Sequence, residues 1–347
     1  MKLRKITAFI LALMMLVSAF SVCSFAADDE LEALKKEFYF GKGPEINGYS
    51  IDYRYYSPVG RYDNTEYPLV IWLHGMGDGA YDGKQVEKSN IALWASESYQ
   101  SRFKGSEGAF IFAARSIEEE GLFWTDELIH PLRAAIDAFI HDNWYNIDLE
   151  RIYIGGYSMG GKMTLKMAVA YPELFAAAFP ICPAWVPGTD ATAKLADMPI
   201  WLTSGVADPL VNYFTWVMPT WENIIAQSDV PEDCRFSTLS RTAYANGLPT
   251  SSAHHSWFSV NNDMFSSRNG NYPAMKTVDG NGDKVTLSYP DGMISWLSGH
   301  RSDYNGEKAR NSGNLEAQTS DGSVSGINLI LTLVSNFFEY IRMSIGL

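Results

Sequence analysis

The chain has 347 residues, of which 46% are hydrophobic, and a formal net charge of −13 at pH 7. This length and apolar content allow a large buried core and exclude a disordered or fibrous protein. The acidic balance disfavours nucleic acid and anionic lipid as partners, so neutral or cationic substrates fit the chain better than polyanions.

The first 26 residues are predicted to be a secretory signal peptide. Three basic residues near the start precede an apolar stretch at 6–22, and small residues precede a cleavage site after Ala26. We therefore expect a secreted, extracellular protein. Removal of the leader would take the net charge from −13 to −16. It would leave Cys182 and Cys234, and the sequence leaves open whether these two pair in an oxidising location.

Apolar runs alternate with helical patterns between residues 49 and 298, which predicts an α/β domain with a mostly parallel central sheet and helices on both faces. Few residues separate the fifth and sixth predicted strands, so no large cap domain is expected. The predicted strands are 49–56, 67–73, 108–113, 151–155, 175–181, 198–203 and 235–241, and the predicted helices are 125–141, 162–171, 214–228 and 291–298.

The predicted catalytic domain is 27–298, and three further segments are predicted within it or after it. Residues 261–289 are expected to form an insertion in which 275–278 pair with 284–289 as a β-hairpin. The aspartate- and glycine-rich turn inside this insertion lacks the features of an EF-hand, so no metal is expected there. Residues 299–326 have the composition of a flexible linker.

The tail at 327–347 is apolar along one helical face. Three polar or charged residues interrupt it, so a transmembrane span is not expected. One interpretation is an amphipathic helix that makes a peripheral membrane contact or docks a partner. The alternative is a helix packed back onto the domain or loosely attached to it.

The most informative motif is the Gly-x-Ser-x-Gly pattern at 156–160, which has Ser158 at its centre. It follows an apolar strand and precedes a helix, which is the context of a nucleophile elbow. A serine hydroxyl becomes a nucleophile when a base lies within hydrogen-bond reach and a third group orients the base. We therefore predict Ser158 as the nucleophile, against the alternative of an ordinary serine in a glycine-rich turn.

The acid and the base of such a site follow the serine in that order, on loops after later strands. Asp208 follows the predicted strand 198–203 and opens a loop, so it is the candidate acid, with a turn-forming or capping role as the alternative. His254 and His255 come after the last predicted strand. Adjacent side chains on a loop point in different directions, so only one of them is expected to reach Ser158.

The oxyanion hole of an acyl-transfer site needs two aimed backbone N–H groups. Candidates are the amide of Met159, directly after the serine, and the amide of Met76 in the glycine-rich loop at 73–77. His74 in the same loop is predicted to be a structural hydrogen bonder. Trp257 and Trp185 are predicted to line the substrate site, with ordinary packing as the alternative.

Together these segments resemble the α/β-hydrolase superfamily over residues 49–298. The branch they resemble most is that of secreted esterases grouped with feruloyl and acetyl xylan esterases, polyhydroxybutyrate depolymerase-like esterases and prolyl-oligopeptidase-like predicted peptidases. In related sequences a small or polar residue and then a tryptophan often follow the base, and Ala253-His254-His255-Ser256-Trp257 fits this pattern with His254 as the base. A shorter His-x-Trp variant selects His255, so His254 is the predicted base and His255 is the alternative. The motifs that carry the resemblance are 73–77, 146–161, 171–178 and 205–211.

The resemblance implies a secreted serine esterase that cleaves carboxylic esters through an acyl-enzyme, with no metal or organic cofactor. Ester substituents on plant polysaccharide are the implied substrates. A serine peptidase of the prolyl-oligopeptidase-like type is the alternative within the superfamily. A non-catalytic polysaccharide- or surface-binding module on a hydrolase scaffold is the alternative from another functional class. Acyl and alcohol specificity and oligomeric state are not determined by the sequence.

Overall fold

The computed structural model describes residues 30–58, 65–118, 121, 123–242, 249–263, 275–287 and 292–304. The predicted signal peptide, the predicted tail and most of the predicted linker lie outside these residues. Within the described part of the chain, none of the helices combines the length and apolar character that crossing a membrane requires.

The described residues contain one nine-stranded sheet with the strand order β1-β2-β4-β3-β5-β6-β7-β8-β9. The six strands from β4 to β8 in this order are parallel, whereas β1, β2 and β9 pair antiparallel at the edges. The strands are β1 (Tyr39–Lys42), β2 (Asp52–Tyr56), β3 (Tyr67–Leu73), β4 (Phe110–Ala114), β5 (Ile147–Tyr157), β6 (Ala177–Ile181), β7 (Trp201–Gly205), β8 (Arg235–Leu239) and β9 (Met275–Asp279).

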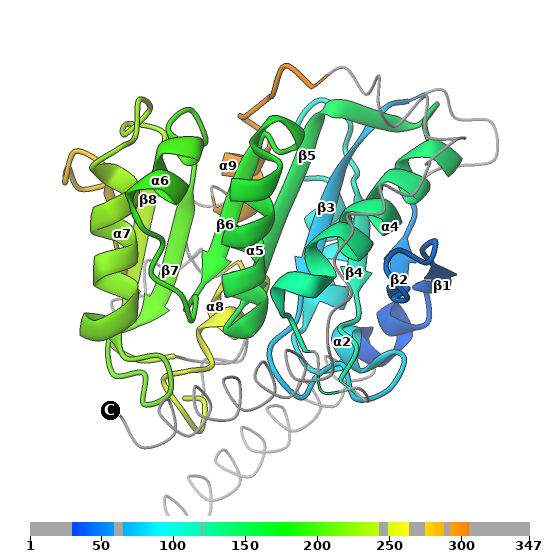
Figure 1. Cartoon of the computed structure of the whole chain (residues 1–347), viewed down its shortest axis with the longest axis horizontal. Coiled ribbons are helices and arrows are strands. Elements are labelled where there is room, and N and C mark those ends of the chain that lie inside the picture. The colour runs from blue at the N-terminus through cyan, green and yellow to red at the C-terminus, as the bar shows by residue number, and fades with distance from the viewer. Residues whose placement is uncertain are drawn as a thin grey trace, which may run out of the picture.

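Helices cover the sheet, with α4, α5 and α7 across the face that is nearer in Figure 1 and α9 behind it. A π-helical segment, Tyr213–Val217, leads into α7. The helices are α2 (Lys84–Glu87), α3 (Glu97–Gln100), α4 (Ile129–Asp142), α5 (Met159–Ala170), α6 (Thr189–Thr192), α7 (Met218–Ile225), α8 (Ser256–Asn261) and α9 (Met293–Leu297). The prediction of a mostly parallel sheet with helices on both faces is thus confirmed.

The centre of the sheet is buried on both faces, as the continuous apolar run of β3 predicts. All seven residues of β3 are buried, and Tyr67–Leu73 matches the predicted strand residue for residue. Aromatic rings from neighbouring elements fill the space beside it, because Phe179 stacks against Trp72 and Trp94 with ring centroids 6.2 and 5.8 Å apart. Stacking of this kind adds to the free energy gained by burying the rings.

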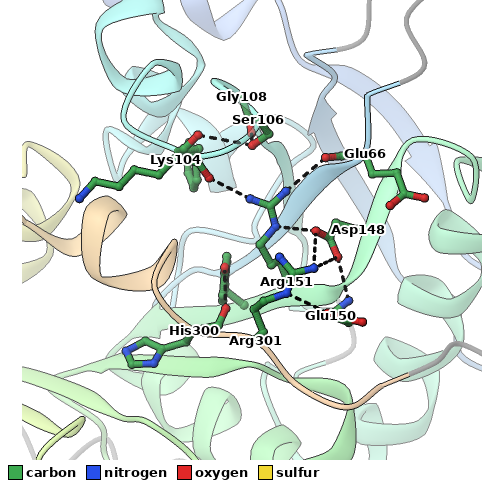
Figure 2. A network of polar contacts seen from close by, with 11 residues as sticks. Glu66, Lys104, Ser106, Gly108, Asp148, Glu150, Arg151, His300 and Arg301 are labelled. Carbon is green, nitrogen blue, oxygen red and sulfur yellow. Dashed lines mark hydrogen bonds and ion pairs between the residues drawn. The ribbon is translucent and has the colours of Figure 1, made fainter.

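The start of the predicted linker belongs to the folded body, which corrects its expected beginning at residue 299. Figure 2 shows that Arg301 reaches Asp148 and Glu150 on β5, with nitrogen–oxygen distances of 3.1 and 2.8 Å. Tyr304 is 8% exposed and lies 3.5 Å from an Arg133 nitrogen on α4. Glycine- and polar-rich composition predicted flexibility, but it does not reveal that two side chains in this stretch have partners in the domain.

The predicted hairpin insertion is partly a strand of the main sheet. Met275–Asp279 pairs along its whole length with β8 rather than standing apart as a hairpin. The return segment contacts it through a single bridge between Val278 and Lys284, and a tight turn between Asp279 and Asp283 connects the two. Residues 288 and 289 of the predicted hairpin lie outside the described residues.

Gly155→Ala tests the packing at the centre of the sheet. A Cβ at this position would lie 2.2 Å from the Phe179 ring, which is held between two tryptophans. We expect the substitution to lower the free energy of unfolding by about 1–3 kcal/mol, because the ring has to leave its stacked position. Denaturant unfolding measures the change. Gly188→Ala is the control, since a Cβ there meets nothing within 4 Å, and equal stability of the two variants would contradict the packing argument.

Candidate active site

Ser158 sits in a strained backbone conformation between β5 and α5. Its φ of 57° and ψ of −118° lie in a region that side chains other than glycine rarely adopt. Conformations of this kind cost about 1–3 kcal/mol and persist only where the surroundings enforce them. The Ser158 amide donates to Ile181 O at 2.9 Å, which fixes the turn against the end of β6. The side chain is therefore held at the corner between strand and helix.

Three glycines allow this turn to pack against its neighbours. A Cβ on Gly156 would lie 2.4 Å from Leu73 O, and one on Gly160 would lie 2.1 Å from the same atom. A Cβ on Gly161 would lie 2.6 Å from Ile181 O. Real Cβ atoms do not approach backbone oxygens this closely, so the end of β3 and the end of β6 close around the serine only because these positions carry no side chain.

Asp208 lies in the loop after β7 and is almost fully buried. Its Oδ1 accepts hydrogen bonds from the amides of Leu210 at 2.8 Å and Val211 at 2.9 Å. Its Oδ2 lies 2.7 Å from Nδ1 of His254. The two backbone donors orient the carboxylate and satisfy one oxygen, which leaves the other for the imidazole. The carboxylate thus has both a turn-forming contact and a histidine partner.

His254 is the member of the histidine pair whose ring contacts Asp208. Close approach of two backbone segments brings it there, since a Cβ on Gly205 at the end of β7 would lie 2.3 Å from Ala253 O. The His254 amide donates to the Ser252 hydroxyl at 3.1 Å, which orders the loop before the ring. With Nδ1 directed to the carboxylate, Nε2 is the nitrogen that remains for a second partner.

The ring of His255 lies elsewhere, packed against Trp257 and Phe258 with ring centroids 4.9 and 6.1 Å away. Its Nδ1 is buried and has no hydrogen-bond partner among the described residues. Burial and the neighbouring His254 lower the pKa of His255. The two adjacent side chains therefore have different surroundings, as the sequence predicted for neighbours on a loop.

The electrostatics of His254 depend on two acidic neighbours. Burial lowers the pKa of His254, but Cys182 and the hydrogen-bonded Asp208 outweigh it and raise the pKa. Cys182 directly follows β6, and its thiol lies 3.7 Å from the His254 carbonyl oxygen. Cys182 and Cys234 are both buried free thiols, so they form no disulfide.

The loop after β3 carries Met76 and is held by hydrogen bonds on both sides. The neutral His74 ring donates from Nδ1 to Gly75 O at 2.6 Å and accepts at Nε2 from the Ser116 amide at 3.0 Å. Burial lowers the pKa of His74 to about 4, so the ring stays uncharged in this role. Its function as a structural hydrogen bonder agrees with the prediction. Met159, the other candidate donor, begins α5 directly after the serine.

Charged side chains near this loop were missed by the sequence reasoning. Glu118 accepts from the Gly77 amide at 2.8 Å, and Lys84 donates to Gly77 O at 2.5 Å. Asp78 accepts a hydrogen bond from the hydroxyl of Tyr157, the residue before the serine. Burial raises the pKa of both Asp78 and Glu118. The position of Asp78, directly after the glycine-rich loop, is the one sequence feature that could have indicated this contact.

The two tryptophans predicted to line the site differ in their surroundings. Trp257 is 8% exposed and stacks on Tyr157 with ring centroids 4.1 Å apart, and the edge-on ring of His254 also contacts it at 5.4 Å. Trp185 is half-buried, and the Lys166 ammonium lies 4.9 Å from the centre of its ring. Trp257 therefore links the elbow strand to the histidine. The substrate-lining role of both residues stays a prediction.

The arrangement combines a strained serine, a buried imidazole and a carboxylate held by two amides. Ser158 and His254 are both 6% exposed. Tyr157, the residue before the serine, packs on the same tryptophan as the His254 ring. Groups of this kind on neighbouring loops suit the transfer of a proton from a hydroxyl to an imidazole, followed by attack on a carbonyl.

Comparisons with known proteins find similarity to carboxylesterases. The family model for phospholipases and carboxylesterases matches residues 115–235. A probable carboxylesterase of rice, Oryza sativa subsp. japonica, is 26% identical over a match that covers 41% of this chain and 60% of the rice protein. The chain thus spans about three fifths of the length of this curated relative.

Solved structures with a similar fold include the crystal structure of a thermostable esterase. It is 27% identical with a TM-score of 0.55, and the match covers 67% of this chain and 62% of that chain. An acylaminoacyl peptidase in complex with Z-Gly-Gly-Phe-chloromethyl ketone is 15% identical with a TM-score of 0.46, covering 66% of this chain and 40% of the peptidase.

Asp208→Asn tests the electrostatic coupling between the acid and the imidazole. The negative charge of Asp208 favours the protonated ring of His254. Without that charge we expect the pKa of His254 to fall by at least about one unit. Nuclear magnetic resonance of the histidine side chains during a pH titration measures it, with His255→Gln used to assign the signals. Asp142→Asn, at an exposed carboxylate at the end of α4, is the control. An unchanged titration of His254 in Asp208→Asn would contradict the coupling.

Proposed function

We propose that this chain is a serine carboxylesterase of the α/β-hydrolase superfamily, with Ser158, His254 and Asp208 as its catalytic residues. The observations that carry the proposal are the 2.7 Å contact between His254 Nδ1 and Asp208 Oδ2 and the strained elbow of Ser158. Trp257 links the two, because it stacks on Tyr157, the residue before the serine, and contacts the His254 ring. The carboxylesterase family model and the esterase fold neighbour support the reaction class.

The geometry suits the two halves of an acyl transfer. The imidazole takes the Ser158 proton at Nε2 as the hydroxyl attacks the ester carbonyl, and it later gives this proton to the leaving alcohol. Asp208, bound to Nδ1, keeps the ring in the required tautomer and stabilises the imidazolium that forms. Water then attacks the acyl-enzyme by the reverse sequence, with the imidazole again as the base.

The negative oxygen of each tetrahedral intermediate needs donors that are already in place. In this proposal the amides of Met159 and Met76 supply them, at the start of α5 and in the loop after β3. The hydrogen bonds of His74 to Gly75 O and Ser116 N support this role, because they fix the loop before substrate binds. Loss of one oxyanion donor typically costs about 100- to 1,000-fold in rate.

The substrate class is proposed from the sequence. The leader at residues 1–26 favours a secreted enzyme that meets its substrate outside the cell. The acidic net charge favours neutral esters, among which are ester substituents on plant polysaccharide. A peripheral membrane or partner contact through residues 327–347 belongs to the same proposal, since one face of that segment is apolar.

Ser158→Ala tests the proposed nucleophile. We expect hydrolysis of nitrophenyl acetate and of feruloyl esters to fall by several orders of magnitude, on the scale of about a millionfold seen when a serine hydrolase loses its nucleophile. Labelling by a fluorophosphonate probe should disappear as well. Ser101→Ala, at an exposed serine, is the control. Undiminished labelling or turnover in Ser158→Ala would overturn the assignment of the nucleophile.

Substitution of each histidine separately tests the choice of base. His254→Gln should lose turnover almost as completely as Ser158→Ala, because the proton has no acceptor that Asp208 can orient. His255→Gln should keep turnover within about tenfold, since its ring packs against aromatic side chains away from the carboxylate. Steady-state kinetics on nitrophenyl acetate measure both. The reverse order of losses would identify His255 as the base.

A further inference from the structure

A third potential ligand lies beside the acid and the base. The thiol of Cys182, a carboxylate oxygen of Asp208 and a ring nitrogen of His254 all lie within 4.8 Å of one another. The three residues come from the segments after β6, after β7 and before α8, and all three are buried. The parallel order of β6, β7 and β8 brings these segments to one end of the sheet.

Backbone contacts hold the three groups in this arrangement. The Cys182 amide donates to Thr203 O on β7 at 2.8 Å, and its thiol reaches the His254 carbonyl oxygen at 3.7 Å. The carboxylate of Asp208 is fixed by two amides, as described above. A ligand set whose members are already held in place binds an ion with a smaller loss of conformational entropy.

The chemistry of the set selects a class of ion. One sulfur, one imidazole nitrogen and one carboxylate oxygen suit Zn²⁺ and softer thiophilic cations such as Cd²⁺. Ca²⁺ and Mg²⁺ prefer six or more oxygen ligands, and Asp208 is the only member of this set that offers oxygen. Typical Zn–S and Zn–N distances of about 2.3 and 2.0 Å place the ligand atoms about 3.3–3.7 Å apart. Separations within 4.8 Å therefore need side-chain shifts of only about 1 Å.

We propose that Cys182, Asp208 and His254 form an inhibitory binding site for thiophilic divalent cations such as Zn²⁺ and Cd²⁺. Binding releases the thiol proton and the proton of the ligating ring nitrogen to water, and it places the cation on the imidazole and the carboxylate that the proposed reaction uses. The fourth position is filled by water or by the Ser158 hydroxyl. The inhibitory effect rests on the proposed function, whereas binding of the ion does not depend on turnover.

Cd²⁺ binding to the full chain tests the site independently of activity. Titration with CdCl₂ should produce the ultraviolet charge-transfer band of a thiolate–Cd²⁺ bond. Cys182→Ser should remove the band and weaken Cd²⁺ affinity, measured calorimetrically, by at least about tenfold. Cys234→Ser, at the other buried free thiol, is the matched control and should keep both. A band that survives in Cys182→Ser, or no band in the unchanged chain, overturns the site.

Two further measurements separate the site from the enzyme. X-ray absorption of the Zn²⁺-loaded full chain should show one sulfur near 2.3 Å and nitrogen or oxygen near 2.0–2.1 Å, and a shell of oxygen alone overturns the site. Saturating Cd²⁺ should lower nitrophenyl acetate turnover at least about tenfold in the unchanged chain, reversibly with EDTA, but not in Cys182→Ser. Binding at Cys182 with unchanged turnover overturns the inhibition. Absence of turnover in the metal-free chain would refute the proposed function. In that case the thiolate–Cd²⁺ charge-transfer band would still show whether the cation site exists.

Discussion

The site depends on backbone segments that approach one another more closely than side chains would allow. Gly160 brings the start of α5 against the end of β3, and Gly205 brings the histidine loop against the end of β7. The first approach sets the loop after β3, which carries Met76, beside the serine, and the second sets the imidazole beside the carboxylate. A Cβ at either glycine would meet a carbonyl oxygen at 2.1 or 2.3 Å, so both approaches need the absence of a side chain. The strain at Ser158 persists because the same packed neighbours enforce it.

Burial of several acidic groups gives the site its electrostatic character. Asp208 is stabilised by two amides and an imidazole, whereas Asp78 and Glu118 lie near the loop after β3 and have raised pKa values because they are buried. Lys84 contacts the same loop through Gly77 O, and its positive charge partly offsets the two carboxylates. The loop that would bind a developing negative charge is thus held by charged side chains whose balance depends on pH.

Periodicity and composition predicted the centre of the fold well, because local patterns follow from burial on both faces of a parallel sheet. Tyr67–Leu73 is an example in which an unbroken apolar run defines the strand fully. The edge strands are harder to predict. Tyr39–Lys42 is largely exposed, and its residues do not alternate between buried and exposed. The sequence around Met275–Asp279 predicts a hairpin, because it does not reveal that this strand pairs with β8. The place of Tyr304 in the body likewise depends on α4, which is distant in sequence.

The order of the candidate serine, acid and histidine was also predicted, and His254 was favoured as the base over the adjacent His255. His254 and His255 have nearly the same sequence context, and only the approach of Ala253 to Gly205 shows which ring contacts the acid. The position of Cys182 had no sequence signal beyond the end of a strand. Burial and fixed orientation within a few ångströms prepare an acid and a base for proton transfer. The same two features make them suitable metal ligands when a thiol lies beside them as the third ligand. Cys182 therefore provides a packed, polarizable neighbour for the imidazole of His254, and in our proposal it also makes the site sensitive to thiophilic cations.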